Sequence, residues 1–289
     1  MAARPRMFLL AVLGIAFLTL MDAVAKALAA DYHTLQIVLG RFGFATLWIA
    51  ALAIFLRPGW PRRERLGAHG IRAVLMIATS SAFFYALGHL PLADVFVLAY
   101  TAPMFVALFG ALLLKEPVER GTLGAIVCGF AGVLVIALGG VGADGHGARP
   151  WLAIGCAVAS PVTYALGTVL LRAQTAHEPV LTIVLTQSAI VALLMLPATA
   201  GVFDMPTRDH WIAFAALGFL GAAGYLAFAH AIAKLPAAQV AVADYSGLIW
   251  AAGIGFFYFA ETPRPTMWAG AALIVGGSAL MLRKKKPAP

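Results

Sequence analysis

The sequence predicts an all-α polytopic membrane protein with ten transmembrane helices. Hydrophobic residues make up 62% of the 289 residues and charged residues only 11%, and the mean hydropathy is +0.92. Soluble domains are nearer half apolar and a quarter charged. Apolar stretches of about 20 residues, the length that crosses a bilayer, recur along the whole chain. An unusually hydrophobic soluble domain is therefore the disfavoured alternative.

Hydropathy, Pro/Gly breaks and charged connections divide the chain into its expected helices. In order, these are 7–29, 34–56, 72–89, 92–114, 121–139, 151–171, 179–200, 211–233, 237–260 and 265–282. The connections are mostly short, which leaves no room for a domain outside the membrane. The first segment resembles a cleaved signal peptide in its basic start, but its apolar region is long and its removal would leave nine spans.

Basic residues predict the orientation of these helices. With the N-terminus inside, the cytoplasmic segments hold Arg4, Arg6, Arg57, Arg62, Arg63, Arg65, Arg72, Lys115, Arg120, Arg172, Lys234, Arg283, Lys284, Lys285 and Lys286. The opposite connections hold Arg149, Arg208 and Arg264. This excess follows the positive-inside rule and places both termini in the cytoplasm. The net charge of +8 is thereby explained without a nucleic-acid partner.

Motifs for enzymatic chemistry are missing from the sequence. Cys128 and Cys156 both fall in apolar segments and form no CxxC pair, so they predict neither a disulfide framework nor a metal site. No HExxH or GxSxG motif and no P-loop occurs. We therefore predict no catalytic residue, no metal and no cofactor. Because no P-loop for ATP is present, any transport by this chain would have to be driven by a gradient. A membrane-embedded enzyme or a channel is the remote alternative to such a transporter.

An internal repeat relates the two halves of the chain. The segment "LPLADVFVLAYTAPMFVALFGALLLKEP" (90–117) aligns without a gap on "LPAAQVAVADYSGLIWAAGIGFFYFAET" (235–262), at an offset of 145 residues. Residues that rarely match by chance coincide, namely Pro91 with Pro236, Tyr100 with Tyr245, Gly110 with Gly255 and Glu116 with Glu261. We expect each glutamate to anchor a loop at the end of its helix.

Five helices in each repeat is an odd number, so equivalent helices cross the membrane in opposite directions. This inverted arrangement is typical of secondary transporters, whose two halves meet around a site near the bilayer midplane. We predict a first five-helix repeat over 1–140, a second over 150–283 and a basic cytoplasmic tail over 284–289.

The repeat also resembles a known family. The runs "ALLLKEPV" and "FFYFAETP", each followed by a Gly-rich fifth helix, resemble the EamA-type drug/metabolite transporter superfamily, as does "ADYHTLQIVLGRFGFATLWI". The second half departs from the pattern, because Leu248 stands opposite Pro103 and Ala260 opposite Lys115. The resemblance implies a carrier of small organic metabolites in the inner membrane. It also implies that four helices of each half surround a central cavity, while helices five and ten lie outside and can form a dimer.

Two charges interrupt the first helix in "LMDAVAKAL", Asp22 and Lys26. An Asp at a helix centre costs about 2.5–3.5 kcal/mol on insertion scales, so Asp22 should face protein or water. Asp22 and Lys26 are one turn apart and can form an ion pair. Alternatively both converge with Arg41 of the second helix, where the excess positive charge would receive a substrate carboxylate. Snorkelling of Lys26 and a purely structural Asp22–Arg41 clamp are the competing interpretations.

Asp244 in "VADYSG" lies about two turns into the predicted helix 237–260, from the cytoplasmic side. Its repeat counterpart is Ala99, so the symmetric architecture does not require it. A buried carboxylate can bind a substrate amine or accept a proton during transport. Aromatic and amide side chains could complete the site, with helix packing as the alternative in each case. These further candidates are Tyr85, Tyr100, Tyr164, Gln187, His230, Tyr245 and Trp250.

Two prolines inside helices, Pro103 and Pro161, are candidate hinges, with a static kink as the alternative. Taken together, the sequence predicts a secondary transporter that moves an amino acid, vitamin or similar amphipathic metabolite across the inner membrane by alternating access. We expect efflux, with proton coupling left open and uptake of riboflavin or another cofactor as the alternative. The expected partners are the small-molecule substrate and the lipid bilayer, and the chain is a monomer or a homodimer.

Overall fold

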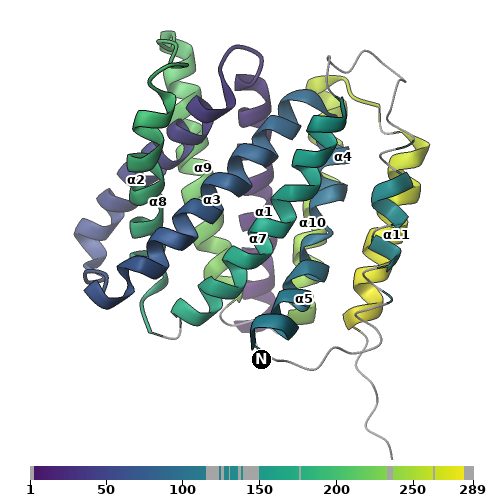
Figure 1. Ribbon diagram of the computed structural model, residues 1–289, viewed down its shortest axis with the longest axis horizontal. Helices are drawn as coiled ribbons and strands as arrows, with labels where there is room; N and C mark the ends of the chain where they lie inside the picture. The colour runs from purple at the N-terminus through teal and green to yellow at the C-terminus, as the bar shows by residue number, and fades with distance from the viewer. Residues whose placement is uncertain are drawn as a thin grey trace, which may run out of the picture.

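A computed structural model describes residues 3–114, 124, 127–129, 131–135, 138, 150–175, 177–232, 237–262 and 264–282. In this part of the chain every regular element is a helix, as the sequence predicts. The helices stand side by side in one bundle (Figure 1). Of the predicted fifth helix, over 121–139, only scattered residues are described, and each of these is helical.

Most of the described helices begin and end within four residues of their predicted boundaries, but the third begins at Leu66 and not at residue 72. The first repeat contains α1 (Ala3–Leu28), α2 (Thr34–Leu56), the short 3₁₀ helix η1 (Arg63–Arg65), α3 (Leu66–His89), α4 (Leu92–Ala99) and α5 (Ala102–Leu114). The second contains α7 (Pro150–Thr175), α8 (Val180–Thr199), α9 (Arg208–Ile232), α10 (Ala237–Phe259) and α11 (Pro265–Leu282).

Six of the described helices are long and apolar enough to cross a membrane, namely α1, α2, α3, α7, α8 and α9. Three shorter apolar helical stretches lie at Leu92–Val106, Ser246–Phe259 and Pro265–Gly276. The chain is therefore a multi-pass membrane protein, and the total of ten spans stays a prediction.

The predicted fourth helix is divided into α4 and α5 at Tyr100 and Thr101. Thr101 Oγ1 donates to the carbonyl of Leu98 at 2.8 Å, which satisfies an acceptor at the end of α4. Pro103 lies in the first turn of α5, where a helix requires no backbone N–H. The equivalent α10 has Leu248 in place of this proline and continues without a break. A single residue type thus accounts for the difference between the repeats.

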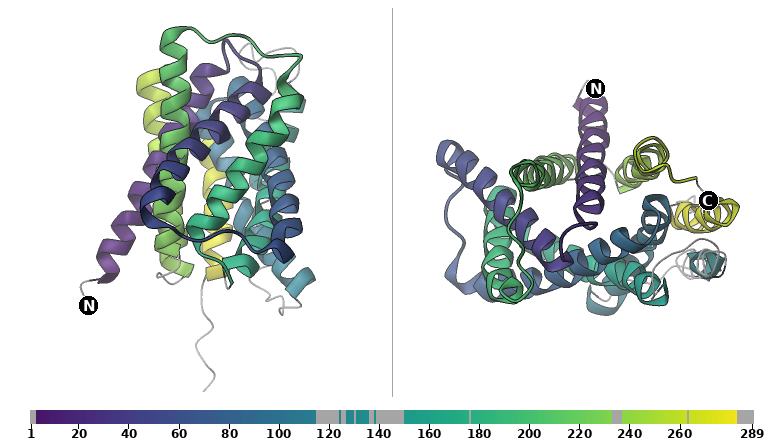
Figure 2. Two further views of the ribbon diagram at one scale, coloured as in Figure 1. Left: turned by 90° about the vertical axis from the view of Figure 1, so that its left-hand side faces the viewer. Right: turned by 90° about the horizontal axis from the view of Figure 1, so that it is seen from above.

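Helices of one repeat pack against helices of the other. α1 packs against α9 and α10, α2 against α8 and α9, and α3 against α7. The end-on view of Figure 2 shows α1 between α9 and α10. Two glycines permit a close approach of α1 and α9, because a Cβ atom on Gly224 would lie 2.9 Å from the Gly14 oxygen and 3.0 Å from the Leu18 nitrogen. Small residues at such crossings let membrane helices pack by van der Waals contact.

The bundle has a basic end and an opposite end. The basic end carries the connections at 57–65 and 177–179, together with the beginning of α1, which Figure 1 places at the bottom. The opposite end carries the connections at 29–33 and 90–91 and the end of α10.

Gly224→Ala should destabilise the protein by about 1–3 kcal/mol, because the added methyl group meets rigid backbone atoms of α1. Thermal unfolding in detergent, followed by intrinsic fluorescence, measures the effect. Gly43→Ala is the matched control, since a Cβ atom there meets no atom within 4 Å. Equal unfolding temperatures for the two variants would contradict the close α1–α9 contact.

Candidate functional site

A central cavity of about 230 Å³ lies between helices of both repeats. Side chains of α1, α2, α3, α4, α7, α8 and α9 line it, together with Ala102 at the beginning of α5. Most of the lining is apolar, and a few polar groups converge on it. This combination is typical of sites for small organic ligands. The polar lining residues are Thr19, Asp22, Arg41, Thr79, Ser80, Tyr100, Ser160, Tyr164, Gln187, Ser188 and Tyr225.

Asp22 and Arg41 bring opposite charges to the same cavity. Asp22 is 7% exposed, and within the described part of the chain its carboxylate makes neither a hydrogen bond nor an ion pair. Arg41 attracts Asp22 electrostatically, but its Nη1 donates to Ser80 Oγ at 2.9 Å. The guanidinium also lies 4.7 Å from the ring centre of Phe42 and 5.4 Å from that of Phe84. These contacts hold Arg41 in place, and it forms no hydrogen bond or ion pair with the Asp22 carboxylate.

Gln187 reaches the cavity from α8, and a buried arginine holds it from behind. Arg72 Nη2 donates to Gln187 Oε1, and Arg72 Nη1 donates to Gln174 Oε1 at 2.6 Å. Arg72 and Tyr225 line a second, small cavity together. Arg72, counted above among the basic residues of the cytoplasmic segments, is a buried helix residue and not an exposed charge, because α3 begins at Leu66 and Arg72 is only 2% exposed.

Aromatic side chains form much of the remaining wall. Phe83 and Phe96 are in edge-to-face contact, with ring centres 5.9 Å apart. Phe228, Tyr100 and Tyr164 line the cavity as well. Such walls bind flat or amphipathic molecules, while the hydroxyl groups fix their orientation.

The internal repeat extends to the cavity lining. Three positions of α3 and the three positions of α9 that follow at the offset of 145 residues all face the cavity. These pairs are Met76 and Gly221, Ser80 and Tyr225, and Phe83 and Phe228. Equivalent faces of two equivalent helices therefore enclose one site, as in transporters built from inverted repeats.

Pro161 lines the cavity from the middle of α7. A proline has no backbone N–H, so the carbonyl of Ala157 loses its usual helical donor. Ser160 Oγ donates to that carbonyl at 3.3 Å. A serine thus satisfies the acceptor that the proline leaves, as membrane helices require away from water.

Lys26 does not join Asp22 and Arg41 in the cavity. Its Nζ forms an ion pair with Glu261 Oε1 at 2.9 Å and donates to the carbonyl oxygens of Leu87 and Leu90 at 2.9 and 2.6 Å. Glu261 Oε2 also accepts the N–H of Leu92 at 2.8 Å. The predicted ion pair of Lys26 with Asp22 is therefore replaced by a clamp between the repeats at the opposite end of the bundle.

Of the other candidates, Tyr100, Tyr164, Gln187 and Pro161 line the cavity. Tyr85 stacks on His89 with ring centres 4.2 Å apart, and it does not line the cavity. His230 and Trp250 are exposed side chains outside the cavity lining. The side chains of Pro103, Asp244 and Tyr245 lie outside the described residues.

Sequence reasoning missed Ser80, Tyr225 and the role of Arg72. Extending the 145-residue offset back to the third helix pairs Phe83 with Phe228 and would have singled out Ser80 and Tyr225. No sequence pattern indicated a buried role for Arg72, because a basic residue at the start of a predicted helix is usually interpreted as a charge at the membrane surface.

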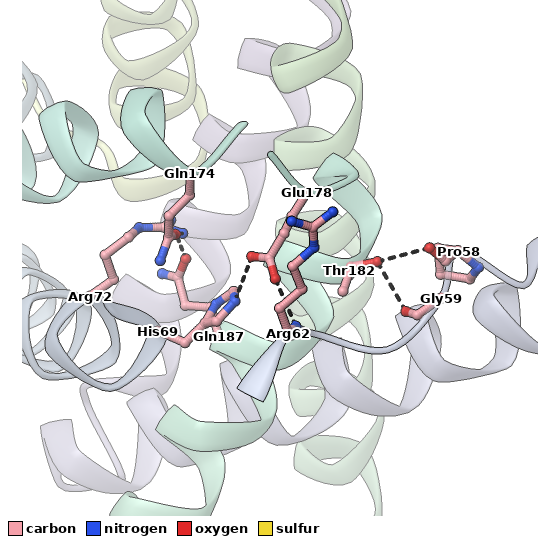
Figure 3. A network of polar contacts seen from close by, with 9 residues as sticks. All are labelled: Pro58, Gly59, Arg62, His69, Arg72, Gln174, Glu178, Thr182 and Gln187. Atoms are coloured by element: carbon pink, nitrogen blue, oxygen red, sulfur yellow. Dashed lines mark hydrogen bonds and ion pairs between the residues drawn. The ribbon is translucent and has the colours of Figure 1, made fainter. Parts of the chain in front are cut away.

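A second polar network joins the repeats at the basic end (Figure 3). Glu178 Oε1 accepts the N–H of Arg62 at 2.9 Å, and Oε2 lies 2.9 Å from His69 Nε2. Thr182 Oγ1 donates to the carbonyl of Pro58 at 3.2 Å. Burial opposes ionisation of Glu178, but the hydrogen bonds from Arg62 and His69, with the charges of His69 and Arg65, lower the pKa of Glu178 overall.

The sequence is similar to known transporters along its length. A profile of the EamA-like transporter family matches it twice, at residues 5–138 and 151–283. The pseudopaline exporter CntI of Pseudomonas aeruginosa is 30% identical over 281 residues, which cover 96% of both chains. A riboflavin transporter of Brucella anthropi is 27% identical over 86% of this chain and 88% of its own. An S-adenosylmethionine uptake transporter of Rickettsia bellii is 20% identical over 92% of this chain and 90% of its own.

A crystal structure of another protein matches the fold with a TM-score of 0.67 at 20% sequence identity, over 97% of both chains. This likeness concerns the fold alone.

Glu178→Gln should lower stability near neutral pH, and its deficit relative to wild type should shrink in acid. The lowered pKa of the native carboxyl means that its ionised form stabilises the fold above its ordinary value of 4.5, and this contribution is lost as pH falls through the lowered native pKa. Unfolding temperatures measured across pH test this. Glu64→Gln, at an exposed residue of η1, is the control. A deficit that does not change with pH would contradict this role of the Glu178 carboxylate.

Proposed function

The chain belongs to the EamA-like transporter family, and we propose that its central cavity carries a small zwitterionic metabolite across the inner membrane. The family makes the protein a membrane transporter of small molecules and not an enzyme.

The Asp22 carboxylate is the observation that carries this proposal. A charge buried among apolar helices costs free energy unless it has a partner. Arg41 is close enough to attract it, yet its hydrogen bond goes to Ser80. A substrate ammonium group at Asp22 would supply the missing partner.

The other end of the substrate would face Arg41. A guanidinium offers several donors in a planar fork and suits a carboxylate. An amino acid or a related amphipathic metabolite carries both groups, and its side chain would contact the aromatic wall formed by Phe83, Phe96 and Phe228. The cavity volume of about 230 Å³ suits a molecule of this size.

Efflux is the direction that we propose. It is supported by the exporter among the relatives, whose identity extends over nearly the whole chain. Uptake of riboflavin or another cofactor is the second candidate, supported by the riboflavin transporter and by the aromatic walls of the cavity. Counterflow in proteoliposomes distinguishes them: exchange of labelled amino acid supports the first, and exchange of labelled riboflavin supports the second.

We further propose that Asp244 and Tyr245 belong to the site. Their repeat counterparts, Ala99 and Tyr100, line the cavity. A carboxylate in this position could accept the proton that drives transport. If Asp244→Asn abolishes proton-driven flux but retains substrate exchange, Asp244 acts in coupling. If both activities are normal, Asp244 is excluded from the mechanism.

We propose that both termini face the cytoplasm, as the excess of basic residues at that side supports. A C-terminal fusion to green fluorescent protein should fluoresce in bacteria, whereas a C-terminal alkaline phosphatase fusion should be inactive. The reverse pattern would contradict this orientation. Any dimer would form through the fifth helix and α11, and native mass spectrometry in detergent would detect it.

Asp22→Asn should raise the KM for an amino-acid substrate about tenfold to a hundredfold, because a neutral amide replaces one half of a charge-assisted hydrogen bond. A thermal-shift screen of metabolites identifies the substrate, and proteoliposome flux then gives the KM. Asp31→Asn is the matched control, since Asp31 is 59% exposed at the opposite end of the bundle. An unchanged KM in Asp22→Asn would remove Asp22 from substrate binding.

A further inference from the structure

We infer that Arg72, which does not line the central cavity, determines which end of a substrate binds beside Gln187 and Tyr225. It does so by turning both side chains into hydrogen-bond donors toward the cavity. Arg72 is therefore a positioning residue that sets the polarity of this wall. The inference rests on the proposed function and adds the orientation of the zwitterion.

Arg72 fixes the orientation of the Gln187 amide. A guanidinium has only donors, so the atom of Gln187 that faces Arg72 has to be the carbonyl oxygen. The amide nitrogen then points away from Arg72, and it has no hydrogen-bond partner among the described residues. Since Gln187 lines the cavity, this N–H₂ group is available to a substrate acceptor.

Tyr225 lies between two arginines. Tyr225 lines the central cavity together with Arg41, and a smaller cavity together with Arg72. Neither guanidinium can accept a hydrogen bond, so the Tyr225 hydroxyl proton has no acceptor in either arginine and can be donated to a substrate. The wall formed by α8 and α9 therefore presents donors from both side chains.

Arg72 also places a positive charge behind this wall. Arg72 is 2% exposed, and among the described residues no carboxylate forms an ion pair with it. Gln174 and Gln187 are neutral acceptors, so the positive charge behind this wall is not cancelled. A buried charge without a counter-ion favours an anionic group nearby. The substrate carboxylate should bind between this wall and Arg41, with the ammonium group at Asp22.

The test compares two probes that differ in the anionic end alone. L-Phenylalanine is a zwitterion, and L-phenylalanine methyl ester keeps the ammonium group but has no carboxylate. Dissociation constants of both are measured on the purified full chain by thermal shift and by isothermal titration. In wild type the zwitterion should bind about tenfold to a hundredfold more tightly than the ester.

Variants of the Arg72 contacts should change this ratio of dissociation constants. In Arg72→Leu the amide of Gln187 can turn either end toward the cavity, so the ratio should fall severalfold, while Arg41 retains the remaining preference. Arg72→Lys keeps the charge and a donor, and it should restore most of the ratio. Gln174→Leu removes the other partner of the guanidinium without altering Gln187, so it should keep the wild-type ratio. A purely structural role would weaken both probes equally and leave the ratio unchanged.

Gln187→Glu keeps the inference falsifiable if Arg72→Leu does not fold. A glutamate at this position can form an ion pair with Arg72, so the protein should remain folded while the cavity loses its N–H₂ donor. The ratio should again fall severalfold. A wild-type ratio in Gln187→Glu would overturn the inference.

The outcomes separate this inference from the proposed function. If wild type binds L-phenylalanine and Asp22→Asn does not, while the Arg72 and Gln187 variants keep the ratio, the proposed function stands and the inference fails. If wild type binds the ester as tightly as the zwitterion, the donor wall is refuted. If wild type binds neither probe, nor tyrosine, tryptophan or histidine, the proposed substrate class and the inference fall together.

Discussion

The structure depends on one constraint, the cost of placing charged groups among apolar helices. Asp22, Arg41 and Arg72 all lie within the bundle, where lipid offers them no hydrogen bonds. Helices of both repeats therefore surround a shared polar interior, in which Ser80, Gln174 and Gln187 accept from the two guanidinium groups. The same requirement that stabilises these charges creates a cavity with polar groups at its wall.

Backbone groups obey the same constraint where helices are interrupted. Ser160 compensates for the donor that Pro161 lacks, and Thr101 satisfies an acceptor at the break between α4 and α5. Both interruptions lie at the cavity, where irregular backbone is tolerated because protein and not lipid surrounds it. The substrate site and the irregular parts of the helices therefore coincide for a physical reason.

Ion pairs join the two repeats at both ends of the bundle. Lys26 and Glu261 join the repeats at one end, and His69 and Glu178 join them at the other. The cavity lies between, enclosed by equivalent faces of α3 and α9. A molecule with two similar halves and polar links at both ends has the parts that alternating access needs, since one set of links can open while the other closes.

The sequence alone determined the helical architecture, the boundaries of most helices and the membership in a transporter family. These features depend on hydropathy and on a repeat that reads along the chain, and even the break before Pro103 follows from local chemistry. Only the tertiary structure decided which polar groups meet. Lys26 pairs with a glutamate from the far end of the chain and not with its helical neighbour Asp22, and Arg72 is buried behind Gln187. Such pairings depend on how helices from two repeats pack, and local sequence does not specify the distance between residues so far apart in the chain.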